Sequence, residues 1–224
     1  MYSTVDSVIP PTQTRTTHRK LSFRRATTPC QRSAKRPAGL EVRPLLRSAA
    51  RGVDRLAAEV GEIDVLVNNA GQAVWAPTEE MKVSDYDAMF AGNVRAPFFL
   101  VAAFAPTMAA KGSGSVINIG SMAGSLGLAT GAAYGATKAA LASLTRGWTA
   151  EYSGRGVRFN TVAPGPVYTR PEARDLFDAL AETTAMKRAA EPAEVAEVVA
   201  FLVSAKAGYV TGATVAVDGG RTAI

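Results

Sequence analysis

The pattern of apolar and polar positions changes near residue 47. From there to residue 224, short and almost continuously apolar runs alternate with longer stretches in which apolar residues recur every three or four positions. The short runs are typical of buried strands, and the longer stretches are typical of amphipathic helices. Strands are predicted at residues 63–67, 115–119, 157–162 and 214–217.

The helical stretches lie between these strands. Helices are predicted at residues 48–60, 84–110 with a break near Gly92, 132–152, 171–186 (loosely helical) and 192–203. Because strands and helices alternate, we expect an α/β fold: a Rossmann-like doubly wound parallel sheet with three α/β/α layers. Ligands of such sheets bind beyond the carboxyl ends of the strands.

Residues 1–46 differ in composition from the rest of the chain. They are rich in Thr, Ser, Pro and Arg, and nine basic residues stand against Asp6 and Glu41, so this segment accounts for the net charge of +6. Such a segment cannot bury enough apolar surface to order itself. We therefore expect a basic, disordered or non-native segment at 1–46 and a truncated Rossmann-type domain at 47–224. Nucleic-acid binding by the basic segment is the alternative, but no interleaved aromatic residues or helix-turn-helix pattern accompany the charge.

Composition excludes several classes of function. The chain is 47% apolar and 20% charged, as soluble globular proteins are, and no apolar run reaches the length of a membrane span. His18 is the only histidine, which excludes a multi-histidine metal site and a Ser-His-Asp triad in the domain. Cys30 is the only cysteine, which excludes an internal disulfide. We expect a cytoplasmic protein with neither a metal nor a membrane partner.

Tyr134 and Lys138 are the first candidate pair for chemistry. Four residues apart on a predicted helix, they share one face. A tyrosine has a pKa of about 10, and a neighbouring cation lowers it, so the pair could act as a general acid and base. Ser121 follows the buried strand at 115–119 and could hold a substrate oxygen; alternatively it caps the next turn.

Three further segments have both a functional and an ordinary structural interpretation. Asn93 interrupts an apolar helix, where it could serve the site or mark a local kink with its amide satisfied by backbone. Residues 68–71, Asn-Asn-Ala-Gly, could let a flat ligand approach the backbone or form a plain turn. Residues 164–169 could grip a ligand or form a plain loop.

Taken together, the order and spacing of these residues resemble the short-chain dehydrogenase/reductase family over residues 47–224. Asn-Asn-Ala-Gly at 68–71 is similar to the family's motif after its fourth strand, and Pro164-Gly165 with Val167 and Thr169 is similar to its nicotinamide loop. Residues 209–212, Tyr-Val-Thr-Gly, and 217–220, Val-Asp-Gly-Gly, are similar to its C-terminal signature.

The resemblance implies an oxidoreductase that uses NAD or NADP and moves a hydride between an alcohol and a ketone or aldehyde. Tyr134 would exchange a proton with the substrate oxygen that Ser121 holds. Lys138 would bind the nicotinamide ribose and lower the tyrosine pKa, and Asn93 would fix a proton-relaying water. The implied catalytic residues are Asn93, Ser121, Tyr134 and Lys138. The implied cofactor-binding residues are Asn69, Ala70, Gly71, Tyr134, Lys138, Pro164, Gly165, Val167 and Thr169.

One family motif is missing from the sequence. The family opens with a strand, a Thr-Gly-x-x-x-Gly-x-Gly loop that binds pyrophosphate, and a helix; before residue 60 this chain has only Gly39 and Gly52. The first βαβ unit is therefore expected to be absent or disordered. Residues 1–46 could be a wrong-frame or misassigned start, an organellar targeting peptide or a divergent variant. A targeting peptide would precede the glycine loop rather than replace it, which favours the first explanation.

The missing motif leaves two function classes open. The chain is either an active NAD(P)-dependent oxidoreductase or a non-catalytic, cofactor-impaired relative. Its central strand at 63–67 would lose a neighbour and expose an apolar edge. Residues 168–190 are expected to form the substrate lid for a small alcohol or carbonyl compound, although their apolar side chains could equally pack on the sheet. The candidate lid and pocket side chains are Leu176, Phe177, Leu180, Met186 and Trp75. By resemblance, we expect a homodimer or homotetramer.

Overall fold

The computed structural model describes residues 49–169 and 171–224. The predictions of a basic segment at 1–46 and of a missing first βαβ unit lie outside these residues. The described part contains one sheet of four parallel strands in the order β1-β2-β3-β4. The strands are β1 (Val65–Asn68), β2 (Gly114–Ile119), β3 (Val157–Pro164) and β4 (Thr214–Val217). The four predicted strands are confirmed to within two residues at every end.

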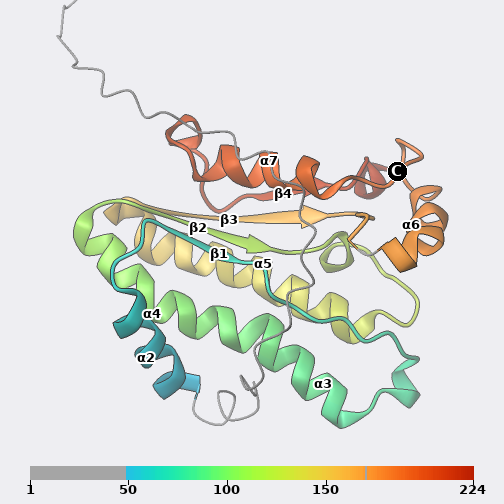
Figure 1. Cartoon of the computed structure of the whole chain (residues 1–224), viewed down its shortest axis with the longest axis horizontal. Helices are drawn as coiled ribbons and strands as arrows, with labels where there is room; N and C mark the ends of the chain where they lie inside the picture. Colours follow the sequence, from blue (N-terminus) through green and yellow to red (C-terminus); the bar gives the residue numbers. More distant parts are fainter. Residues whose placement is uncertain (1–48, 170) are drawn as a thin grey trace, which may run out of the picture. The chain divides into compact units, whose positions relative to one another are not determined.

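Helices cover both faces of this sheet (Figure 1). On one side lie α2 (Ala49–Val60), α3 (Val83–Phe90), α4 (Ala96–Lys111) and α5 (Ala132–Tyr152), and on the other lies α7 (Pro192–Val203). The predicted three-layer, Rossmann-like α/β architecture is thereby confirmed. Short helical turns link the larger elements: η1 (Thr78–Glu80), η3 (Met122–Gly124), η4 (Ser153–Arg155), η6 (Ala205–Ala207) and η7 (Arg221–Ala223).

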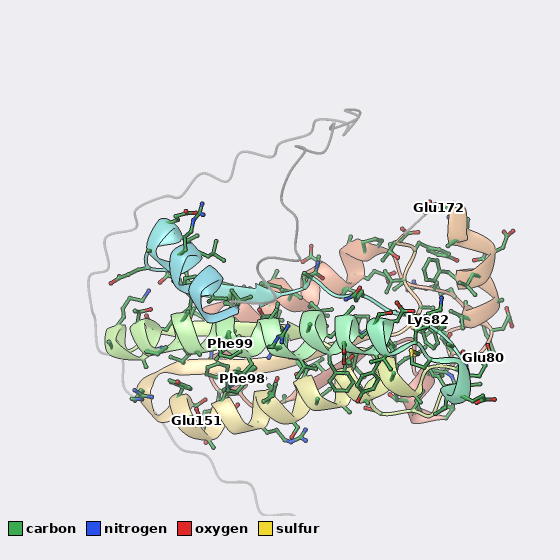
Figure 2. All side chains as sticks on the ribbon, turned by 90° about the horizontal axis from the view of Figure 1, so that it is seen from below. Glu80, Lys82, Phe98, Phe99, Glu151 and Glu172 are labelled. Atoms are coloured by element: carbon green, nitrogen blue, oxygen red, sulfur yellow. The ribbon has the colours of Figure 1, made fainter. Side chains whose placement is uncertain are left out.

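Alternate residues of each strand feed two separate cores, because successive side chains point to opposite faces of a sheet. Val116 and Phe159 are fully buried in the core that α4 and α5 cover. Ile117 and Val162, their chain neighbours or near neighbours, pack instead with Leu202 of α7. Phe98 of α4, labelled in Figure 2, lies 6.2 Å from Trp148 of α5 between ring centroids, so these two helices also pack on each other.

The helix predicted at 84–110 is one continuous rod. Instead of the expected break at Gly92, the π-helical turn η2 (Ala91–Arg95) joins α3 directly to α4. The rod, Val83–Lys111, is long and apolar enough to qualify as a membrane span, contrary to the prediction that no segment reaches this length. Val101 and Met108 of this rod are nevertheless buried against β2 and α5, which is the packing of a core helix.

The segment predicted as a loose helix at 171–186 is shorter than expected. It consists of η5 (Pro171–Ala173) and α6 (Arg174–Ala181), after which the chain turns as far as α7. Lys187 adopts a left-handed conformation with φ of 52°, which is uncommon for a residue other than glycine and ends any helix. The lid therefore carries a single two-turn helix.

Within the described residues, β1 forms one edge of the sheet and pairs only with β2. Val65 and Val67 are each 41% exposed. Their register partners Ser115 and Ile117 belong to the face that α7 covers, so the two valines stand on an uncovered part of that face. The predicted exposed apolar edge is thus present in the described part of the chain.

Candidate active site

The parallel register brings the ends of all four strands to one edge of the sheet. Asn68 pairs with Asn118, and Thr161 with Thr214, so the loops that follow these strands emerge together. A cavity of about 450 Å³ lies among them. Nine of the predicted site residues line it, and only Ala70 and Asn93 do not. The lining consists of Asn69, Gly71, Gln72, Ala73, Ile119, Gly120, Ser121, Tyr134, Lys138, Pro164, Gly165, Val167, Thr169, Phe177, Pro192 and Val195.

Tyr134 stands in the first turn of α5 and meets Ser121 from the loop after β2. Burial raises the pKa of Tyr134 above its ordinary value, and a hydrogen bond with the Ser121 side chain lowers it by a smaller amount. The net shift is upward, whereas the sequence predicted a lowered pKa through Lys138. The Lys138 ammonium lies 5.8 Å from the centroid of the tyrosine ring, and desolvation outweighs it. Tyr134 is therefore protonated at neutral pH in this arrangement.

Ser121 fulfils both of its sequence interpretations. It is the N-cap residue of η3, and its Oγ accepts a hydrogen bond from the backbone N–H of Ala123 at 3.1 Å. The same hydroxyl bonds with the side chain of Tyr134. A hydroxyl has one donor and two acceptor positions, so capping and the site interaction are compatible. The cap fixes where the hydroxyl stands relative to the tyrosine.

Lys138 is buried almost completely, with 6% of its surface exposed. Its Nζ donates to the backbone carbonyl oxygen of Ile119 at 2.8 Å. Burial lowers the pKa of Lys138 to about 8. An ammonium group carries three N–H donors, and the described residues accept one of them. The remaining donors suit the hydroxyl groups of a ligand in the cavity.

Asn93 lies inside the π-helical turn η2 and is 1% exposed. Its Oδ1 accepts from the backbone N–H of Gln72 at 2.9 Å, and its Nδ2 donates to the Gln72 carbonyl at 2.8 Å and to Thr137 Oγ1 at 3.0 Å. The amide thus ties the loop after β1 to α5. This arrangement agrees with the structural interpretation of Asn93, and its role in proton relay stays a prediction.

Gly71 separates Asn93 from Lys138. A Cβ atom at Gly71 would stand 3.1 Å from Asn93 Oδ1 and 3.4 Å from Lys138 Nζ, so the missing side chain keeps this corner of the cavity open. Sequence reasoning missed Gln72 and Thr137, which hold Asn93 in place. The signal for Thr137 was its place on the same helix, three residues after Tyr134, to whose carbonyl its hydroxyl donates at 2.7 Å.

A buried chain of side-chain hydrogen bonds underlies the cavity. Asn68 Nδ2 donates to Asn118 Oδ1, and Asn118 Nδ2 donates to Thr145 Oγ1, both at 2.8 Å. Thr145 Oγ1 also lies 2.8 Å from Thr161 Oγ1. The chain links β1, β2, α5 and β3. The sequence gave no sign of it beyond polar residues inside apolar strands.

The loop after β3 packs tightly on the C-terminal signature. A Cβ atom at Gly165 would stand 2.7 Å from the Cα of Asp218, so only glycine permits this approach. Tyr168 donates a hydrogen bond from its hydroxyl to Asp178 of α6, and the guanidinium of Arg174 lies 4.4 Å from the ring centroid. These contacts attach α6 to the loop whose residues line the cavity.

The lid contributes one apolar side chain to the cavity. Phe177 lines it, whereas Leu176 is 55% and Met186 58% exposed. Trp75 does not reach the lid residues in the described contacts but lies beside Tyr134, 5.6 Å between ring centroids. The expected substrate lid is therefore supported by Phe177 alone.

Comparisons with known proteins agree with this arrangement. Residues 46–222 match the family model described as enoyl-(acyl carrier protein) reductase. Senescence-associated protein 13 of Arabidopsis thaliana is 38% identical over 167 residues, which cover 72% of this chain and 62% of that protein. The 2-(S)-hydroxypropyl-CoM dehydrogenase 3 of Xanthobacter autotrophicus is 40% identical over 174 residues, which cover 74% of this chain and 68% of the relative.

A solved structure is similar in sequence and in fold. The gluconate 5-dehydrogenase of Burkholderia cenocepacia, crystallised with NADP and tartrate, is 35% identical with a TM-score of 0.72. The similarity covers 80% of this chain and 72% of that one. The chain thus spans roughly two thirds to three quarters of the length of these proteins.

Proposed function

Because the chain belongs to the short-chain dehydrogenase/reductase family of oxidoreductases, we propose that it interconverts an alcohol and a ketone or aldehyde with NAD or NADP, using Tyr134 as general acid and base. The observation that carries the proposal is the convergence of Tyr134, Ser121 and Lys138 on one cavity at the carboxyl edge of the sheet. A phenol, a hydroxyl and an ammonium group there provide a proton donor, an oxygen-binding group and a fixed cation.

The residues present fit the nicotinamide and ribose part of such a cofactor. Gly71 leaves open the corner beside the Lys138 ammonium, and that ammonium has donors to spare. Pro164, Val167 and Thr169 supply an apolar and a polar wall opposite. Lys138 would hold the ribose hydroxyls, and the loop at 164–169 the carboxamide side. A bound cofactor would supply or accept the hydride.

Proton transfer is the part of the reaction that this chain's residues perform. In the reductive direction, Ser121 would hold the substrate carbonyl oxygen by a hydrogen bond while hydride adds to the carbonyl carbon. Tyr134 would then give its phenolic proton to that oxygen, so that an alcohol leaves. Its raised pKa keeps this proton in place at neutral pH, which favours reduction over oxidation there.

The assembly and location stay proposals. We propose a homodimer or homotetramer, supported by the 43% exposed Phe98 on α4 and by the small residues Ala139, Ser143 and Gly147 along α5. Small side chains allow helices of two copies to approach closely. Cytoplasmic location stays a prediction of the sequence.

The test is cofactor binding and turnover with purified full-length chain. Titration with NADPH and NADH, followed by fluorescence, should give saturable binding, and a panel of ketones should be reduced. Tyr134→Phe should bind the cofactor with unchanged affinity but lose turnover by at least a hundredfold. Tyr152→Phe, on the same helix but in the core with Phe159, is the matched control and should stay active.

The alternative is the cofactor-impaired relative, which the uncovered valines of β1 and the missing glycine-rich motif favour. Absence of both binding and turnover would establish that alternative. Turnover that survives in Tyr134→Phe would instead refute the assigned role of the tyrosine.

A further inference from the structure

We propose that Trp75 is a specificity-determining residue whose free face holds a flat, uncharged ring of the substrate beside the Tyr134 hydroxyl. The inference rests on the proposed function and names the class of its substrate: a ketone or secondary alcohol with an apolar ring next to the reacting carbon. It is carried by the position, the rigidity and the exposure of the indole.

The indole lies directly beside the proposed acid. The ring centroids of Trp75 and Tyr134 are 5.6 Å apart at an interplanar angle of 48°. The other side of the indole contacts Gly131, the N-cap residue of α5, where an added Cβ atom would stand 2.5 Å from Trp75 Cζ3. Trp75 is thus wedged at the beginning of the helix that carries Tyr134.

The surrounding loops hold the indole in place. The backbone N–H of Ala76 donates to the carbonyl of Thr130 at 3.0 Å, which joins the loop after β1 to the loop before α5. Thr130 has φ of 61°, a costly conformation for a β-branched residue, which persists only where the surroundings impose it. A strained residue next to a site is a reason to look for function there.

Half of the indole is nevertheless open to solvent. Trp75 is 50% exposed, although both Ala73, two residues earlier, and Tyr134 line the cavity. Leaving such a large apolar surface in water forgoes the stabilisation that burial would bring. An aromatic face of this kind binds another flat ring through offset or tilted stacking.

Charge decides what kind of ring fits. Among the described residues that line the cavity, Lys138 is the only charged one, and it serves the cofactor in the proposed function. Phe177, Val195 and Pro192 make the remaining wall apolar. No further cation is present there to pair with a carboxylate or phosphate, so an uncharged substrate is favoured.

The experiment compares two methyl ketones, acetophenone and 2-butanone, in NADPH-dependent reduction by full-length chain. We expect acetophenone to be preferred in kcat/KM. Trp75→Ala should lower that preference about tenfold, mainly through the KM of acetophenone, and should leave 2-butanone turnover unchanged. Trp75→Phe should retain most of the preference. Gly131→Ala, which displaces the indole without removing it, should lower the preference as well.

A binding measurement separates this inference from the proposed function. The chain has two tryptophans, and Trp148 is buried in the core, so Trp148→Phe leaves Trp75 as the sole emitter. Saturable change of this emission with 1-phenylethanol, but not with 2-butanol, is expected. If neither ketone is reduced yet 1-phenylethanol binds in this way, the proposed function fails and the aromatic site stands. If 2-butanone is reduced but the Trp75→Ala preference is unchanged, the role of Trp75 is refuted while the proposed function stands.

Discussion

Lys138 donates from its buried ammonium group to the backbone carbonyl oxygen of Ile119, 2.8 Å away, at the end of β2. This contact fixes the cation where two loops meet, but one hydrogen bond does not compensate for its lost hydration. Burial accordingly lowers the pKa of Lys138 to about 8. A charge kept in the cavity at a cost in stability is typical of a residue retained for function.

Lys138→Met should stabilise the fold and abolish activity. The folded pKa of about 8 lies below the ordinary value of 10.5, so between these values the unfolded chain binds more protons and stability rises with pH. Below pH 8 the full penalty applies, about 3 kcal/mol, offset by about 1 kcal/mol for the hydrogen bond. Urea denaturation at pH 7 should show a gain of about 2 kcal/mol, and the rise between pH 8 and 10 should disappear. Exposed Lys206→Met is the control; the same gain there would contradict the explanation.

Gly71→Ala should weaken cofactor binding without unfolding the chain. The added methyl group would press on Asn93 Oδ1 and Lys138 Nζ at 3.1 and 3.4 Å. We expect the Kd for NADPH to rise by about tenfold, because displacement of the lysine by even a few tenths of an ångström misplaces its donors. Gly127→Ala, where an added Cβ meets nothing within 4 Å, is the matched control. Equal affinities of the two variants would show that the corner at Gly71 is not part of the cofactor site.

Alcohol oxidation should increase with pH, because it requires Tyr134 to lose its proton. Burial raises the tyrosine pKa, so the rate should still be rising above pH 10 while ketone reduction is near its maximum at neutral pH. Ser121→Ala removes the bond that lowers this pKa and should shift the oxidation profile further upward. Profiles of kcat against pH provide the measurement, with Ser125→Ala from the same loop as control. A profile that levels off near pH 7 would refute the raised pKa.

Thr145→Val should destabilise the fold by about 1–3 kcal/mol, although its volume is preserved. The change leaves Asn118 Nδ2 without its acceptor and Thr161 Oγ1 without its partner, in a region that is fully buried. Chemical denaturation should show the loss as a lower midpoint with an unchanged slope. Ser143→Ala, exposed on the same helix, should change stability by less than about 0.5 kcal/mol. A neutral Thr145→Val would mean that buried water satisfies the network.

Val65→Lys should reduce aggregation of the purified chain. Val65 is 41% exposed on an edge strand that pairs only with β2 in the described residues, and a charge on such an edge opposes pairing with another chain. Light scattering during incubation at 37 °C should rise more slowly than for the unmodified chain. Val83→Lys, 75% exposed but at the beginning of α3, is the control that separates edge protection from added charge.

The sequence alone determined the order of strands and helices, the layered fold and nine of the residues that line the cavity. Each depends on local periodicity or on motif spacing, and parallel strands necessarily bring their carboxyl ends to one edge. The π-helical turn at Asn93 was beyond this reasoning, because a glycine and an asparagine in a helix fit a break as well as a wide turn.

Only the tertiary structure decided the electrostatics and the aromatic wall. The pKa of Tyr134 rises rather than falls because desolvation depends on all the groups packed around the phenol, whereas the four-residue spacing to Lys138 reveals only one of them. Trp75 and Tyr134 are 59 positions apart in the chain, and their contact arises because Gly131 has no side chain to keep the indole away. Burial and through-space contact are properties of the folded chain as a whole, which no local pattern of residues contains.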